Sequence, residues 1–111
     1  MPRPAPLQIT QATQGTAVVV AVEGELDLSS VETLAKHLAD HVGGNTVNLT
    51  LDLRELRFMD SSGLKFLIDL HDRAQGEQWQ LELLAPRHES AALVLRATGA
   101  DRALPFVANP L

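Results

Sequence analysis

The chain has 111 residues, of which 45% are hydrophobic and 21% are charged, so it suits one compact domain with a buried core. Its 14 acidic residues against 9 lysines and arginines give a formal net charge of −5, which offers no basic surface to a nucleic acid. Cysteine is absent, and this excludes disulfides, thiolate nucleophiles and cysteine-ligated zinc.

The N-terminal segment and the apolar runs predict where the domain begins and in which compartment it lies. Residues 1–6 are rich in proline and lack the apolar segment of a signal peptide, so we expect a flexible tail ahead of a single domain at 7–111. The longest apolar run, Ala17 to Val22, is too short to cross a bilayer. We therefore expect no membrane contact and, as the default, a cytoplasmic protein.

The first half predicts a hairpin and a helix. Residues 7–11 alternate in polarity and residues 17–22 are mostly β-branched, with Gly15 in the turn between them and Gly24 at the end of the second strand. Ser29 precedes Glu32 by the three residues of a capping box. The first helix follows, and its apolar residues at helical spacing are Val31, Leu34, Ala35, Leu38 and Val42. It is expected to stop at the glycine pair Gly43 and Gly44.

The second half alternates strands with helices. A half-buried strand begins at Val47, with Leu49, Leu51 and Leu53 on one face, and is expected to end near Asp52 and Leu53. A second helix runs from near Ser61 to about Arg73, before a break at Gly76. The stripe that faces the core on this helix consists of Leu64, Leu67, Ile68 and His71. After it we expect a strand at 79–84, a helix at 88–98 that ends at Gly99, and a last strand at 104–107.

This order of elements predicts an α/β fold with a mostly parallel sheet and an N-terminal hairpin strand. Parallel strands buried on both faces are usually apolar throughout, whereas two inner strands here carry polar residues at every second position. We therefore expect the helices mainly on one face of the sheet.

The segment from Asp52 to Leu64 carries the candidate site, because it runs from a strand end through a loop into a helix. Asp60 and Ser61 both suit the N-cap position, and either choice leaves Ser61 at the positive end of the helix dipole. A phosphate on Ser61 would be stabilised by the free N–H groups there, and Gly63 would let the backbone of another protein approach closely. On local physics alone, ordinary helix capping is the favoured interpretation of the same residues.

Two motifs together resemble the STAS domain family, and specifically the stand-alone bacterial anti-sigma factor antagonists. They are Met59-Asp60-Ser61-Ser62-Gly63-Leu64 and the upstream Gly24-Glu25-Leu26-Asp27. The resemblance extends over nearly the whole chain and includes Pro86 and Thr98-Gly99. Lys65 departs from it, since many relatives have a small or apolar residue there.

The resemblance implies a small sheet covered by helices and a regulatory, non-enzymatic function without a cofactor. It implies that the unphosphorylated protein binds an ATP-dependent anti-sigma factor kinase and so frees a sigma factor. The kinase then phosphorylates Ser61, which ends binding, and a serine phosphatase resets the protein. Asp27, Asp60, Ser62 and Gly63 would belong with Ser61 to the partner-facing surface.

The residues also bear on other classes of function. Ser61 lies in no Gly-x-Ser-x-Gly elbow, and no spacing ties a histidine base to it, so a hydrolase is not expected. A receiver-like domain would accept phosphate on Asp52 and hold Mg²⁺ with an acidic cluster. A STAS scaffold or transporter-associated domain would keep the fold without cycling phosphate. His37 and His41 have a metal-binding spacing but no third ligand, so no metal site is expected.

Overall fold

The structure is a computed structural model and describes residues 7–41 and 47–107. The proline-rich segment 1–6 and the glycine pair expected to stop the first helix lie outside these residues. The described residues form a five-stranded sheet in the order β1-β2-β3-β4-β5. The strands are β1 (Gln8–Gln14), β2 (Ala17–Leu26), β3 (Asn48–Met59), β4 (Gln80–Leu84) and β5 (Phe106–Val107). The helices are α1 (Val31–His41), α2 (Ser61–Glu77), α3 (Glu89–Thr98) and α4 (Ala100–Ala103).

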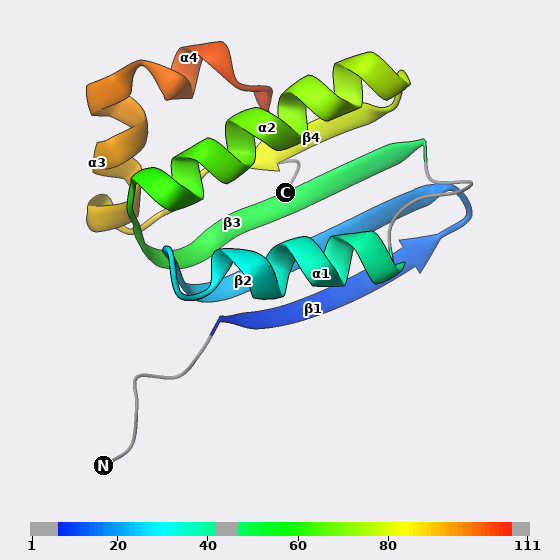
Figure 1. The fold of residues 1–111 in the computed structure, drawn as a ribbon, viewed down its shortest axis with the longest axis horizontal. Coiled ribbons are helices and arrows are strands. Elements are labelled where there is room, and N and C mark those ends of the chain that lie inside the picture. Colours follow the sequence, from blue (N-terminus) through cyan, green and yellow to red (C-terminus); the bar gives the residue numbers. More distant parts are fainter. Residues whose placement is uncertain (1–6, 42–46, 108–111) are drawn as a thin grey trace.

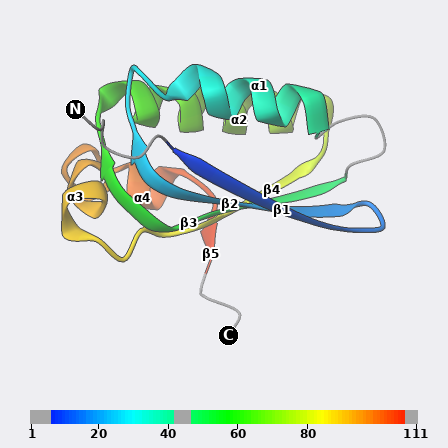
Figure 2. The same cartoon turned by 90° about the horizontal axis from the view of Figure 1, so that it is seen from below.

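The predicted fold class is confirmed. Strands β1 and β2 form an antiparallel hairpin, and each later strand pairs in parallel with the one before it. Helices α1 and α2 cover one face of the sheet, while α3 packs against β3 near one end (Figure 2). The opposite face of the sheet, the open face, carries the polar residues that alternate along the strands. No helix among the described residues has both the length and the apolar character needed to span a bilayer.

Strand β3 runs through the centre of the core and is longer than predicted. Leu49, Leu51 and Leu53 alternate toward the helices and are at most 1% exposed, as expected. Beyond them the buried residues are Leu56 and Met59, which follow at intervals of three. The pairing with β2 shifts twice in this region, and each shift adds one residue to β3. These bulges turn the apolar side chains back to the core, so the segment that we expected to be a loop is strand.

Two predicted boundaries are wrong for reasons of local geometry. Gly24, expected to end the second strand, lies inside β2 with φ 114° at the second register shift. Gly76, expected to break the chain, lies inside α2, because a helix tolerates one exposed glycine at about 1 kcal/mol. Helix α2 instead ends at Gln78, which has a left-handed φ of 62° and donates its N–H to the carbonyl of Ala74.

The buried face of α2 is also shifted from the prediction. Ile68 was expected in the apolar stripe, yet its side chain is 41% exposed. Leu70 is buried there instead, and Phe66 packs half-buried against the core. The buried positions of this helix are Gly63, Leu67, Leu70 and Ala74. Because Gly63 is one of them, the face that touches the sheet begins in the first turn of the helix.

The predicted capping box of α1 does not form. The helix begins at Val31, so Ser30 and not Ser29 precedes it. The Ser29 hydroxyl instead donates to Oδ1 of Asp27 at 2.6 Å. Near the C-terminus, α3 ends at Gly99 with φ 79° as predicted. Helix α4 was not predicted, and β5 covers only the second half of the strand expected at 104–107.

Candidate functional site

The start of α2 is attached directly to the sheet. Asp60 is the single residue between the end of β3 and the first residue of α2. Its N–H donates to the carbonyl oxygen of Leu26, the last residue of β2, at 3.3 Å. Its carboxylate oxygen Oδ1 accepts from the backbone N–H groups of Ser62 at 2.9 Å and Gly63 at 3.2 Å. Asp60 is therefore the N-cap, which settles the choice that the sequence left open between Asp60 and Ser61.

Ser61 occupies the first helical position and is exposed. Within the described part of the chain, no hydrogen bond holds its hydroxyl. Ser62, the next residue, is half-buried and gives its N–H to the Asp60 cap. The first serine thus presents a hydroxyl to solvent on a backbone whose position is fixed.

Gly63 is buried, and its lack of a side chain serves the packing of this chain itself. A Cβ atom there would lie 2.6 Å from the carbonyl oxygen of Leu26 and 2.7 Å from Cγ of Met59. We expected this glycine to let a partner's backbone approach, but the close approach is made by the end of β2. Gly63 therefore positions the helix start.

The loop between β2 and α1 lies beside this helix start and is held by Asp27 and Ser30. Oδ1 of Asp27 accepts from the hydroxyl of Ser29 at 2.6 Å and from its N–H at 3.0 Å. The Ser29 hydroxyl is the main cause that holds the pKa of Asp27 below its ordinary value of 3.8. Asp27 is consequently a carboxylate at neutral pH, half-exposed at the surface.

Ser30 is the residue that sequence reasoning missed. Its side chain is 8% exposed, accepts from the N–H of Asp27 at 3.0 Å and donates to the carbonyl of Glu25 at 2.7 Å. It thereby closes the loop on the end of β2. Serines bond to nearby backbone in this manner before many helices, so the double serine at 29–30 was the available signal.

The fold brings the predicted partner-facing residues together. The β2–α1 and β3–α2 connections lie side by side at one end of the sheet (Figure 1). That end carries Asp27 from the first connection and Asp60 to Gly63 from the second. Leu28 is 78% exposed there, whereas Leu26 is fully buried. The site is an exposed hydroxyl next to two carboxylates and one exposed apolar side chain.

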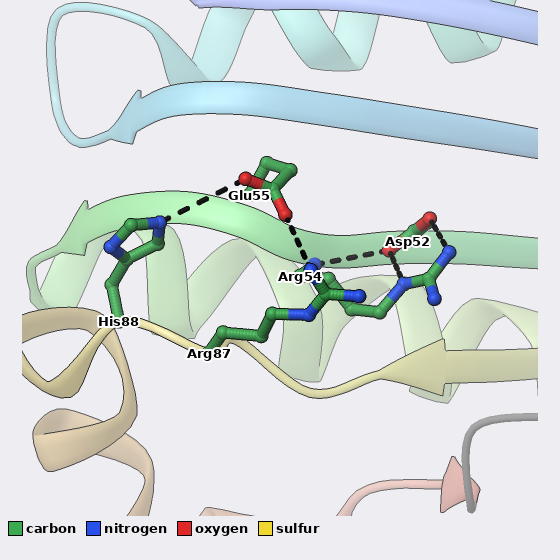
Figure 3. A network of polar contacts seen from close by, with 5 residues as sticks. All are labelled: Asp52, Arg54, Glu55, Arg87 and His88. Atoms are coloured by element: carbon green, nitrogen blue, oxygen red, sulfur yellow. Dashed lines mark hydrogen bonds and ion pairs between the residues drawn. The ribbon is translucent and has the colours of Figure 1, made fainter.

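Asp52, the phosphate acceptor of the receiver alternative, is not at a strand end. It lies in the middle of β3, where its two oxygens accept from Nε and Nη2 of Arg54 at 3.0 and 2.8 Å (Figure 3). These hydrogen bonds hold the pKa of Asp52 below its ordinary value. Neighbouring Glu55 is bound by Arg87 at 3.2 Å. These groups are ion pairs on the open face, and the described residues contain no group of three or more potential ligands placed to hold a metal ion.

Comparison with known proteins identifies the family. The family model described as "Mlab, STAS domain" matches residues 9–107. The match covers most of the chain, so the chain belongs to the STAS domain family.

Two curated relatives come from Mycobacterium tuberculosis. Osmosensory protein A is 36% identical over 76 residues, which are 67% of this chain and 48% of that protein. Anti-sigma-F factor antagonist RsfB is 31% identical over 67 residues, which are 60% of this chain and 55% of that protein. The chain spans about half the length of these two relatives.

Solved structures share the fold at lower identity. An anti-sigma factor antagonist from Mycobacterium paratuberculosis matches with a TM-score of 0.81 and 23% identity, covering 97% of this chain and 92% of that one. Unphosphorylated SpoIIAA, also an anti-sigma factor antagonist, matches with a TM-score of 0.68 and 22% identity, covering 95% and 89%. SpoIIAA in its phosphorylated form matches with a TM-score of 0.66 and 20% identity, covering 92% and 93%. These structures show that the chain shares its fold with proteins described as anti-sigma factor antagonists.

Proposed function

We propose that this chain is an anti-sigma factor antagonist that binds an anti-sigma factor kinase until that kinase phosphorylates Ser61. The observation that carries the proposal is the exposed Ser61 hydroxyl on the first residue of a helix whose start is fixed by Asp60 and Gly63. The names of RsfB and SpoIIAA support the pathway, and the phosphorylated form of SpoIIAA supports the modification. In the proposed cycle, binding frees a sigma factor in the cytoplasm, and a serine phosphatase restores the binding form.

The proposed switch acts through the surface of the site. Asp60 already occupies the N–H groups of Ser62 and Gly63, so a phosphate on Ser61 has fewer free donors than the sequence suggested. It would add about 1.5 to 2 negative charges next to the Asp60 carboxylate. A partner surface that fits the neutral hydroxyl would then face repulsion and the cost of desolvating a dianion. Binding is lost while the fold persists.

The proposed roles of the partner-facing residues differ. Ser61 and the half-exposed Asp27 present their side chains to the partner. Ser62 contacts the partner as part of the first turn of α2. Asp60 and Gly63 act mainly by holding that turn in place. The Asp60 carboxylate accepts the N–H of Ser62, and the missing side chain of Gly63 lets the turn lie against Leu26.

The modification is tested by incubating the purified chain with ATP and the anti-sigma factor kinases of its source organism. Trypsin cleaves after Arg57 and Lys65, so one peptide contains both Ser61 and Ser62 and no other hydroxyl side chain. We expect one phosphate on this peptide, its loss in Ser61→Ala and its retention in Ser62→Ala. Equal modification of Ser61→Ala and the wild type would refute the assignment.

The consequence for binding is tested with Ser61→Asp. This variant should keep the far-ultraviolet circular dichroism and melting behaviour of the wild type, because position 61 is exposed. Its affinity for the kinase that modifies Ser61 should fall by at least about tenfold in a calorimetric titration, since a charge is added at the contact. Wild-type affinity in a folded Ser61→Asp variant would contradict the electrostatic explanation.

A second candidate function is a STAS scaffold or transporter-associated domain that does not cycle phosphate. The match to Osmosensory protein A, whose name refers to another process, supports it. This candidate predicts that the peptide at 58–65 stays unmodified in growing and stressed cells, and that Ser61→Asp leaves partner binding unchanged.

A further inference from the structure

Strand β1 forms an outer edge of the sheet without the features that usually protect such an edge. It pairs with β2 over all seven of its residues, and no other described element pairs with its free side (Figure 1). Its sequence, Gln-Ile-Thr-Gln-Ala-Thr-Gln, contains no charge and no proline, and its register with β2 has no bulge. Lysines, prolines and bulges are the common means of keeping an edge strand from pairing with another chain.

Strand β1 is uncharged on both sides of Gln11, and its two end residues, Gln8 and Gln14, are identical. In an antiparallel pairing of two copies centred on this residue, Gln8 lies opposite Gln14 and Ile9 lies opposite Thr13. Thr10 then lies opposite Ala12, and Gln11 lies opposite itself. A twofold dimer requires a surface that is complementary to itself, and this register places no like charges across from each other.

The same register also matches the faces of the two sheets. Ile9 packs against the core, and Oε1 of Gln11 lies 2.7 Å from Nε2 of His37 on α1, so these residues belong to the helix-covered face. Gln8, Thr10, Ala12 and Gln14 therefore belong to the open face. Pairing centred on Gln11 opposes only residues of the same face, so the helices of both copies lie on one side of a continuous sheet.

We propose that a second copy of this chain binds along β1, antiparallel and centred on Gln11. The observations that carry it are the uncharged, unprotected edge and the register about Gln11, which opposes uncharged residues of the same face. One pair of seven-residue strands makes a small interface, so the dimer is weak and forms in a concentration-dependent manner. The proposal is independent of the chemistry of Ser61.

Sedimentation velocity of the whole chain over a roughly hundredfold range of concentration tests the dimer and its register. In Gln8→Lys with Gln14→Lys, two lysine pairs oppose each other across the interface. In Gln8→Lys with Gln14→Glu, the same positions form two opposite-charge pairs. We expect the first variant to weaken the dimer about tenfold or more relative to the second, although its net charge is closer to zero.

Each alternative result has a clear meaning. A wild-type chain that stays monomeric throughout overturns the proposal, and the edge then stays open or serves a strand of another protein. A dimer that responds equally to both variants, or to neither, forms through a different surface and also overturns it. Thermal melts of both variants establish that they are folded.

Cysteine cross-linking gives a second test, because the chain has no cysteine. Residues opposite each other in an antiparallel pair have Cα atoms about 4.5–5.5 Å apart, within the range of a disulfide. Gln11→Cys should therefore give a disulfide-linked dimer under mild oxidation. Gln14→Cys is the matched control, since its two thiols would lie about 20 Å apart in the proposed register. Equal cross-linking of the two variants would overturn the register.

Discussion

Gly63 and Leu26 are in such close contact that only glycine fits between the start of α2 and the end of β2. A Cβ atom at position 63 would lie 2.6 Å from the Leu26 carbonyl oxygen, and that oxygen also accepts the N–H of Asp60. The obstacle is backbone, which cannot rotate aside as a side chain can. The geometry of the proposed switch site thus depends on an absent side chain.

Gly63→Ala should lower the free energy of unfolding by about 1–3 kcal/mol, because the helix start must move away from β2. Gly76→Ala is the matched control in the same helix, where an added Cβ meets nothing within 4 Å. It should raise stability by about 0.5–1 kcal/mol through the better helix propensity of alanine. Urea unfolding of both variants measures the difference, and equal stability of Gly63→Ala and the wild type would contradict the contact.

Asp60→Ala should reduce stability by about 1 kcal/mol, because it removes the acceptor of the Ser62 and Gly63 N–H groups. Asp60→Asn should retain most of that stability, since asparagine caps a helix about as well. The same urea titrations check this. If Asp60→Asn is as unstable as Asp60→Ala, the effect comes from the charge and not from the cap.

Ser30→Ala should lower stability by about 1–3 kcal/mol, because it leaves the N–H of Asp27 and the carbonyl of Glu25 without the buried hydroxyl. Ser29→Ala removes an exposed hydroxyl and should change stability by less than about 0.5 kcal/mol. Amide hydrogen exchange should show faster exchange at Asp27 only in Ser30→Ala. Unchanged protection there would show that the loop is held by other contacts.

Asp52→Asn should lower stability near neutral pH by about 1–3 kcal/mol, since it replaces a half-buried carboxylate that binds Arg54. The folded pKa of Asp52 lies below 3.8, so the carboxylate contributes its full stability above that value. This contribution is lost as the pH falls through the folded pKa. The difference between the variant and the wild type should therefore shrink in acid.

Urea unfolding across this pH range measures the effect. Asp69→Asn serves as the control, because that carboxylate pairs with Lys65 on an exposed surface and its side chain is 61% exposed. Its removal should have little effect on stability. A difference between Asp52→Asn and the wild type that stays constant down to the acid limit would contradict the link to Asp52.

The first half of β3 could be predicted and the second half could not. Leu49, Leu51 and Leu53 alternate because one face of an unbroken strand is buried, and alternation is visible in a single sequence. The bulges opposite β2 change the spacing to three at Leu56 and Met59. Bulges are set by pairing with another strand, so nothing in the local sequence distinguished this stretch from a loop.

The candidate site was also predictable where its structure depends on neighbouring residues, and not where it depends on residues far away in the sequence. The helix start at 60–61 was predictable, since capping residues act on N–H groups in the next turn. The choice of Asp60 over Ser61 depends also on the hydrogen bond from Asp60 to Leu26, which lies far away in the sequence. The role of Gly63 has the same origin, because only the folded chain shows that β2 fills the space beside it.

The single-residue connection between β3 and α2 has a consequence for any enzyme that modifies Ser61. Such a connection has no slack, so this serine cannot leave the surface and enter an active site as part of an extended peptide. A kinase would have to dock on the folded end of the sheet and bring its ATP to a stationary hydroxyl. Unfolded chain would then be a poor substrate, and the reaction would report on the folded state of the protein.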